Sequence, residues 1–135
     1  MDTITLSTAA TLAEKEATAV LAERTGATVT TADRPGAGFN IALAEHGWVQ
    51  PPEAPSDSQW IWIRLTPDGA GELIATQGSF LFTALSLLEQ GLSASLRAKL
   101  ADGVLLPSTF NLHRPHYDAC LTQYWRSARG FEDEA

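Results

Sequence analysis

The 135-residue chain has the composition of a globular domain, with 44% hydrophobic and 19% charged residues and a formal net charge of -7. This length allows a hydrophobic core without metal or disulfide support, and a single cysteine, Cys120, excludes an internal disulfide. The negative charge disfavours contact with phosphate backbones, so we expect no nucleic-acid partner.

The first third of the chain predicts strands and one capped helix. β-branched and alternating apolar residues predict short strands at residues 3–6, 27–31 and 39–44. Thr11-x-x-Glu14 is a capping box, and the helix that it opens is expected to run to about Thr25 and to end at Gly26. The loop at 33–38 contains Gly36-Ala37-Gly38, which lacks the lysine of a phosphate loop and is interpreted as turn glycines.

A hairpin is predicted next. Trp60 and Trp62 alternate with isoleucines, which places both tryptophans on one face of a strand. Pro67-Asp68-Gly69 has the residue types of a tight turn, and residues 73–75 form the partner strand. The segment before this hairpin, residues 45–59, is rich in proline and polar residues and predicts a surface loop.

An apolar helix follows the hairpin. Gly78 ends the extended run, Ser79 is the expected N-cap, and leucines at helical spacing continue to a C-cap at Gly91. Residues 93–99 predict a short helix, and residues 116–129 predict an amphipathic one. The acidic residues 131–135 resemble the first turn of a further helix, so we expect that the chain was cut from a longer polypeptide.

This order of elements predicts an α+β fold. We expect a mixed β-sheet of about four to five strands with two main helices packed on one face, and a C-terminal helical tail. The expected organisation is one α/β accessory domain at 1–107 and a helical tail or linker at 108–135.

The hairpin and the helix after it resemble a known module, the small α/β domain that precedes the catalytic barrel in β-N-acetylhexosaminidases, α-glucuronidases and related glycoside hydrolases. The matching positions are Trp62-x-Arg64-x-Thr66, Gly71-x-Leu73-x-Ala75, and Gly78 followed by Phe82, Ala84, Leu85, Leu88 and Gln90. The chain departs from the family where a tyrosine is usual at Trp60 or Trp62 and in lacking a glycine-rich start to the hairpin.

The resemblance implies a hexosaminidase domain-2-like fold and a non-catalytic role. Because the catalytic carboxylates of these enzymes lie in the barrel, no catalytic residue is carried over to this chain. The implied partner is a C-terminal catalytic domain of the same polypeptide, with carbohydrate as a further partner, and no cofactor. No apolar run spans a membrane and no signal peptide is present, so the protein is expected to be cytoplasmic, or secreted if an upstream signal peptide was removed.

Three sets of residues are candidate sites. If exposed, Trp60 and Trp62 would form a platform for stacking sugar rings, but we favour burial under a helix or against a neighbouring domain, because one face of such a sheet is normally covered. Tyr124 and Trp125 are candidates for an interdomain docking surface. His113 and His116 are weak metal-ligand candidates, because Pro115 separates them and Cys120 fits an apolar stripe; we therefore expect no metal site.

The carboxylates give no sign of acid–base chemistry. The following acidic residues lie at predicted exposed helix or turn positions and are expected to be solvated: Glu14, Glu16, Glu23, Glu53, Asp57 and Asp68. The leading hypothesis is therefore a non-catalytic N-terminal accessory domain that braces a glycoside-hydrolase barrel. The alternatives are a carbohydrate-binding module using Trp60 and Trp62, and an interaction domain that homodimerises through a sheet edge or the tail.

Overall fold

The computed structural model describes residues 1–56, 58–88 and 94–107. In chain order its elements are β1 (Thr3–Ser7), α1 (Leu12–Thr25), β2 (Thr28–Ala32), β3 (Phe39–Leu43), the 3-10 helix η1 (Ala44–His46), β4 (Trp60–Leu65), β5 (Gly71–Ala75), α2 (Gly78–Ser86), α3 (Ala94–Ala98) and β6 (Val104–Pro107). Within these residues, the longest apolar helix falls short of what is needed to cross a membrane.

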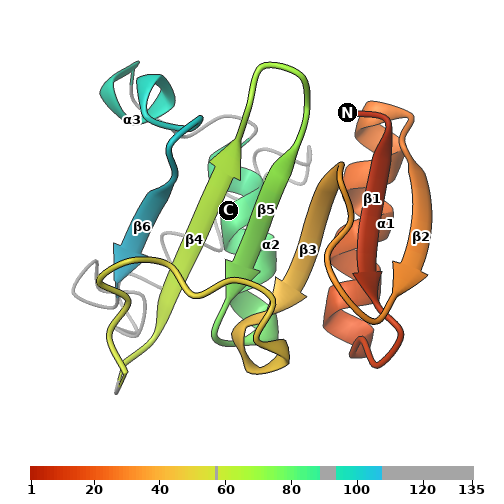
Figure 1. The fold of residues 1–135 in the computed structure, drawn as a ribbon, viewed down its shortest axis with the longest axis horizontal. Coiled ribbons are helices and arrows are strands. Elements are labelled where there is room, and N and C mark those ends of the chain that lie inside the picture. Colours follow the sequence, from red (N-terminus) through yellow and green to blue (C-terminus); the bar gives the residue numbers. More distant parts are fainter. Residues whose placement is uncertain (57, 89–93, 108–135) are drawn as a thin grey trace, which may run out of the picture.

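The strands form one mixed sheet in the order β2-β1-β3-β5-β4-β6 (Figure 1). Strands β2, β1, β3 and β5 are parallel, whereas β4 runs antiparallel to both of its neighbours. The predicted mixed sheet with two helices is confirmed, with six strands instead of four or five. The extra strand is β6, where Val104 and Leu106 are buried beside β4.

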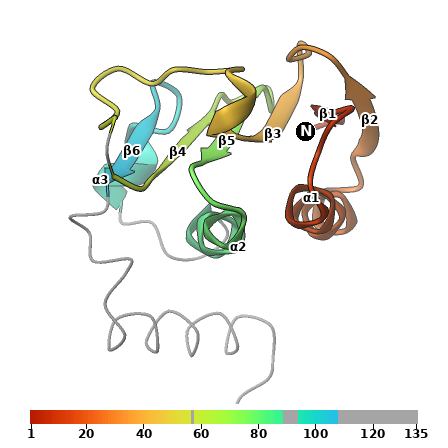
Figure 2. The same cartoon turned by 90° about the horizontal axis from the view of Figure 1, so that it is seen from below.

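The main helices lie on one face of the sheet, and the core fills the space between the two layers (Figure 2). The largest fully buried residues of this core come from the strands and from α2: Ile4, Phe39, Ile41, Ile61, Ile63, Leu73, Leu81 and Leu85. Helix α1 begins with the predicted capping box of Thr11 and Glu14 and ends at Gly26, whose φ of 77° is left-handed.

The part of the opposite face that β3, β5, β4 and β6 form is covered by the long connection between β3 and β4 (Figure 2). Trp48, Val49 and Ala54 of this connection pack against a second apolar cluster that contains Trp60 and Trp62. The sheet is therefore buried on both faces in this region, as expected for a largely parallel sheet.

A six-residue connection at 33–38 joins two parallel strands, β2 and β3, that lie on either side of β1. Parallel strands usually need a longer crossover, often a helix. Here the chain lies directly on β1: a Cβ on Gly36 would be 2.8 Å from Thr5 Oγ1, and one on Gly38 would be 2.8 Å from the Thr3 carbonyl oxygen. These glycines thus permit close backbone approach and are not the turn formers that the sequence suggested.

The start of α2 also differs from the prediction. The N-cap is Gln77, not Ser79, and its side chain makes no capping hydrogen bond. Glycine is required at the next position because a Cβ on Gly78 would lie 2.7 Å from Cβ of Ala13 at the start of α1. The two helices therefore begin side by side, at the end of the sheet where the parallel strands β1 and β5 terminate. The predicted C-cap of α2, Gly91, lies outside the described residues.

Candidate functional site

A row of polar side chains crosses the face of the sheet opposite the helices. The strand register places Thr5 of β1 beside Asn40 of β3, Asn40 beside Glu72 of β5, and Glu72 beside Arg64 of β4. We call these four residues the polar row. Thr5, Asn40 and Glu72 are buried, so their polar atoms need partners within the protein.

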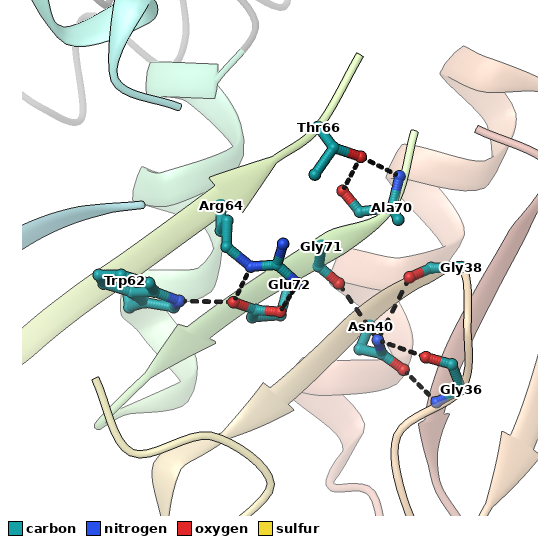
Figure 3. Close-up of polar contacts among 9 residues, drawn as sticks. All are labelled: Gly36, Gly38, Asn40, Trp62, Arg64, Thr66, Ala70, Gly71 and Glu72. Carbon is teal, nitrogen blue, oxygen red and sulfur yellow. Dashed lines mark hydrogen bonds and ion pairs between the residues drawn. The ribbon is translucent and has the colours of Figure 1, made fainter. Parts of the chain in front are cut away.

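Glu72 receives hydrogen bonds from two neighbouring side chains of β4 (Figure 3). Arg64 donates from Nε to Oε2 at 2.8 Å and from Nη2 to Oε1 at 2.9 Å, which is the bidentate geometry of a strong ion pair. The indole Nε1 of Trp62 donates to Oε2 at 2.8 Å. Each oxygen of Glu72 is therefore engaged by the strand beside it.

Asn40 binds the crossover at 33–38 to the sheet (Figure 3). Its Oδ1 accepts from the Gly36 N–H at 2.8 Å. Its Nδ2 donates to the carbonyl oxygens of Gly36, Gly38 and Gly71 at 3.2, 3.4 and 3.1 Å. One amide group thereby binds both the N–H and the C=O of Gly36 and joins the crossover to Gly71 of β5.

Arg64 is the member of the polar row that reaches solvent, with 35% of its side chain exposed. Hydrogen bonding to Glu72 raises the pKa of Arg64, partial burial opposes this change, and the charge of Glu72 adds to it. The guanidinium therefore stays charged and paired, and the polar row ends in a neutralised ion pair at the surface.

A second polar cluster lies where α1 begins, at the edge of the sheet where β3 ends. We call it the edge cluster; it consists of Thr11, Glu14, Leu43 and His46. The carboxylate of Glu14 accepts from the Thr11 N–H at 2.7 Å, from the Thr11 hydroxyl at 3.0 Å and from the Leu43 N–H at 3.0 Å. His46 Nε2 lies 2.9 Å from Oε2 and 3.2 Å from Oε1.

The prediction that Glu14 is solvated was wrong, because its side chain has no solvent exposure. Burial on its own raises the pKa of Glu14, but the hydrogen bonds from the backbone of Thr11 and Leu43, from His46 and from the Thr11 hydroxyl outweigh it and lower the pKa. The sequence showed the capping box correctly; it did not show that β3 and η1 close over the carboxylate.

A carboxylate bound to an imidazole is an arrangement that can orient a histidine for proton transfer. In this pair His46 is itself largely buried, with 13% of its side chain exposed, and Nε2 is bound to Glu14. Its ring lies 6.4 Å from that of Trp48, centroid to centroid. The contacts join three segments of the chain: the start of α1, the end of β3, and η1.

Trp60 and Trp62 lie on one strand face, as the alternation predicted, but they are not exposed. Their residues are 4% and 7% exposed, beneath the connection between β3 and β4. A sugar ring could not stack on either indole in this conformation. Trp62 is closely packed as well, since a Cβ on Gly103 would fall 1.9 Å from its ring.

The other predicted site residues, His113, His116, Tyr124 and Trp125, lie outside the described residues, as does Asp57. Within 1–56, 58–88 and 94–107, no group of three His, Cys, Asp or Glu side chains is placed to hold a metal ion.

Sequence reasoning missed Asn40, His46 and Glu72. A signal existed for Glu72: in a hairpin that turns at Pro67-Asp68-Gly69, Arg64 falls opposite Glu72, and an Arg–Glu pair across two strands is favourable. His46 had no comparable signal, because its contact with Glu14 joins residues that are 32 positions apart.

Comparison with protein-family models and with curated proteins finds no match for this chain.

Proposed function

We propose that residues 1–107 form a non-catalytic accessory domain that braces the catalytic barrel of a glycoside-hydrolase-like protein. One observation carries the proposal: the two carboxylates that are buried within the described residues, Glu14 and Glu72, have each of their oxygens bound by donors of the chain itself. Such groups stabilise a fold and are not available to a substrate.

Glycoside hydrolysis needs two carboxyl groups facing one another across the scissile bond, one as acid and the other as base or nucleophile. Glu14 belongs to α1, which lies on the helix side of the sheet (Figure 2), whereas Glu72 binds Trp62 on the opposite face. The two cannot flank one sugar. The acidic residues Glu16 and Glu53 are exposed, which agrees with a role as solvated surface charges.

The resemblance of the hairpin and of α2 supports the assignment of a barrel as the partner. The matching residues build the core: Leu73, Ala75, Ala84 and Leu85 are all buried between sheet and helices. The proposal keeps Tyr124 and Trp125 as the residues that contact the barrel.

The experiment begins with the genomic reading frame beyond Ala135, in which we expect a barrel with paired acidic residues. That barrel is then produced with and without residues 1–107, and the melting temperatures are compared by calorimetry. Removal of the domain should lower the melting temperature of the barrel by several degrees. Steady hydrolysis of chromogenic glycosides by the 135-residue chain alone would contradict the proposal.

A second candidate, an interaction domain that binds its own copy, is favoured by a different observation: β2 is an edge strand of the described sheet.

A further inference from the structure

Strand β2 is an edge of the sheet formed by the described residues, and its own sequence lacks the features that protect an edge from pairing. Its sequence, Thr28–Ala32, has no charge and no proline, and its first four residues are exposed, with Val29 at 44%. Natural proteins usually blunt such edges with charges, prolines or very short strands. The other edge, β6, follows that rule, because it has four residues and ends at Pro107.

The backbone of β2 directs alternate residues outward. Thr28 donates its N–H to the Asp2 carbonyl, and the Ala32 carbonyl accepts from the Thr8 N–H, so these two residues face β1. In a parallel pair the residues that face one neighbour alternate with those that face away. Thr30 therefore also faces β1, and the N–H and C=O groups of Val29 and Thr31 point away from the sheet.

These outward groups are self-complementary, and we propose that β2 pairs antiparallel with β2 of a second copy of this chain. With Thr30 on the two-fold axis, Val29 lies opposite Thr31 of the second copy, and Thr31 lies opposite Val29. Both pairs then exchange N–H and C=O groups as a hydrogen-bonded antiparallel pair does. A register shifted by two residues toward the start of the strand would instead use Ala27, whose N–H already binds the Thr25 hydroxyl.

The side chains and charges fit this register. Thr30 meets its own copy and Val29 meets threonine, which are favourable cross-strand pairs. One acidic and one basic residue lie near each end of the strand, Glu23 and Arg24 before it and Asp33 and Arg34 after it, so antiparallel pairing brings together ends that carry no net charge.

The helices leave room for the pairing. Helix α1 lies over β1, between β2 and β3 (Figure 2). In the dimer the two copies of β1 would be about 14 Å apart, three strand spacings, which exceeds the roughly 10 Å width of a helix. The two copies of α1 would then flank the joined strands without collision.

The interface is small, because only five residues of each chain form the new ladder. Stable dimers generally bury at least about 1,200 Å², so we expect a weak dimer that forms at high protein concentration. The proposal goes beyond the bracing role and stands independently of it, since that role concerns a different partner.

Sedimentation of the full 135-residue chain over a concentration series is the first test. The mass should rise from the 14.5 kDa monomer toward twice that value. Thr30→Lys places like charges opposite one another on the axis and should abolish the rise. Thr28→Lys adds the same charge to the same exposed strand, away from the axis, and should leave most of the rise in mass. A chain that stays monomeric, or a dimer that persists in Thr30→Lys, would overturn the proposal.

Cysteine cross-linking tests the register. In a Cys120→Ser background, Thr30→Cys should form a disulfide-linked dimer with oxidised glutathione, because the Cα atoms of the axial pair lie about 4.5 Å apart. Thr28→Cys is the matched control, since its counterpart in the second copy is four residues along the strand. Circular dichroism confirms that both variants are folded. Equal cross-linking of the two would rule out this register and with it the proposed pairing.

Discussion

Glu14 and Glu72 are both buried carboxylates, but they are stabilised by different kinds of partner. Glu72 is paired with a guanidinium on the adjacent strand, and that guanidinium reaches solvent. Glu14 lies at the third position of α1 and is bound by two backbone N–H groups, a hydroxyl and an imidazole. Its charge is stabilised by the helix N-terminus and by local donors.

The two groups also join different parts of the chain. Arg64 and Glu72 lie on strands that a tight turn and a backbone ladder already hold together. Glu14 joins the start of α1 to the end of β3, 29 residues further along the chain. We infer that the loss of Glu14 disconnects elements, whereas the loss of Glu72 removes one contact between strands that remain paired.

The largest expected effect follows from removal of the Glu14 carboxylate. Glu14→Ala should lower the free energy of unfolding by about 3–5 kcal/mol, because it removes a cap and leaves the Leu43 N–H buried without a partner. Urea denaturation measures the change. Glu16→Ala, an exposed position on the same helix, should change stability by less than about 0.5 kcal/mol. Equal effects of the two substitutions would show that the contacts of Glu14 do not matter.

Glu72→Ala should cost less, about 1–2 kcal/mol, because Arg64 can turn into water and only the Trp62 N–H remains buried and unpaired. The double variant Arg64→Met/Glu72→Leu should recover part of the loss, since apolar residues of similar size often replace an ion pair without penalty. The same denaturation series checks both values. A loss at Glu72 larger than that at Glu14 would reverse the comparison.

The contribution of Glu14 to stability should depend on pH. The pKa of Glu14 in the folded protein lies below its ordinary value of 4.5. As the pH falls, the unfolded chain therefore binds more protons than the folded chain does. The stabilisation that the Glu14 carboxylate gives is thus fully present above its ordinary pKa of 4.5 and is lost as the pH falls through its folded pKa. The difference in unfolding free energy between the native chain and Glu14→Gln should narrow from pH 6 to pH 3. A constant difference across this range would contradict the lowered pKa.

Local patterns in the sequence were sufficient to predict several turns and caps, although not the N-cap of α2, which is Gln77 instead of Ser79. The capping box of Thr11 and Glu14, the end of α1 at Gly26 and the hairpin turn at Gly69 each depend on residues that are close in the chain, and each prediction is confirmed. Strand β6 was missed because its residues become a strand by pairing with β4, some forty positions away.

The candidate sites were harder to predict for the same reason. The alternation of Trp60 and Trp62 gave their common face, but whether that face was exposed depended on the connection between β3 and β4. Likewise, Glu14 has the sequence context of an exposed cap, and its burial depends on contacts from Leu43 and His46. Sequence patterns of a few residues do not contain such long-range contacts.

The smallest effect in the edge cluster should come from His46. In His46→Ala the carboxylate of Glu14 keeps its backbone donors from Thr11 and Leu43, so the expected loss is about 1 kcal/mol, the value of one hydrogen bond. In a Glu14→Ala background the same substitution should cost less, because the imidazole no longer has a carboxylate to bind. A double-mutant cycle of the two positions measures this coupling. Additive losses would mean that the 2.9 Å contact between His46 and Glu14 does not stabilise the protein, and that η1 is held by its packing alone.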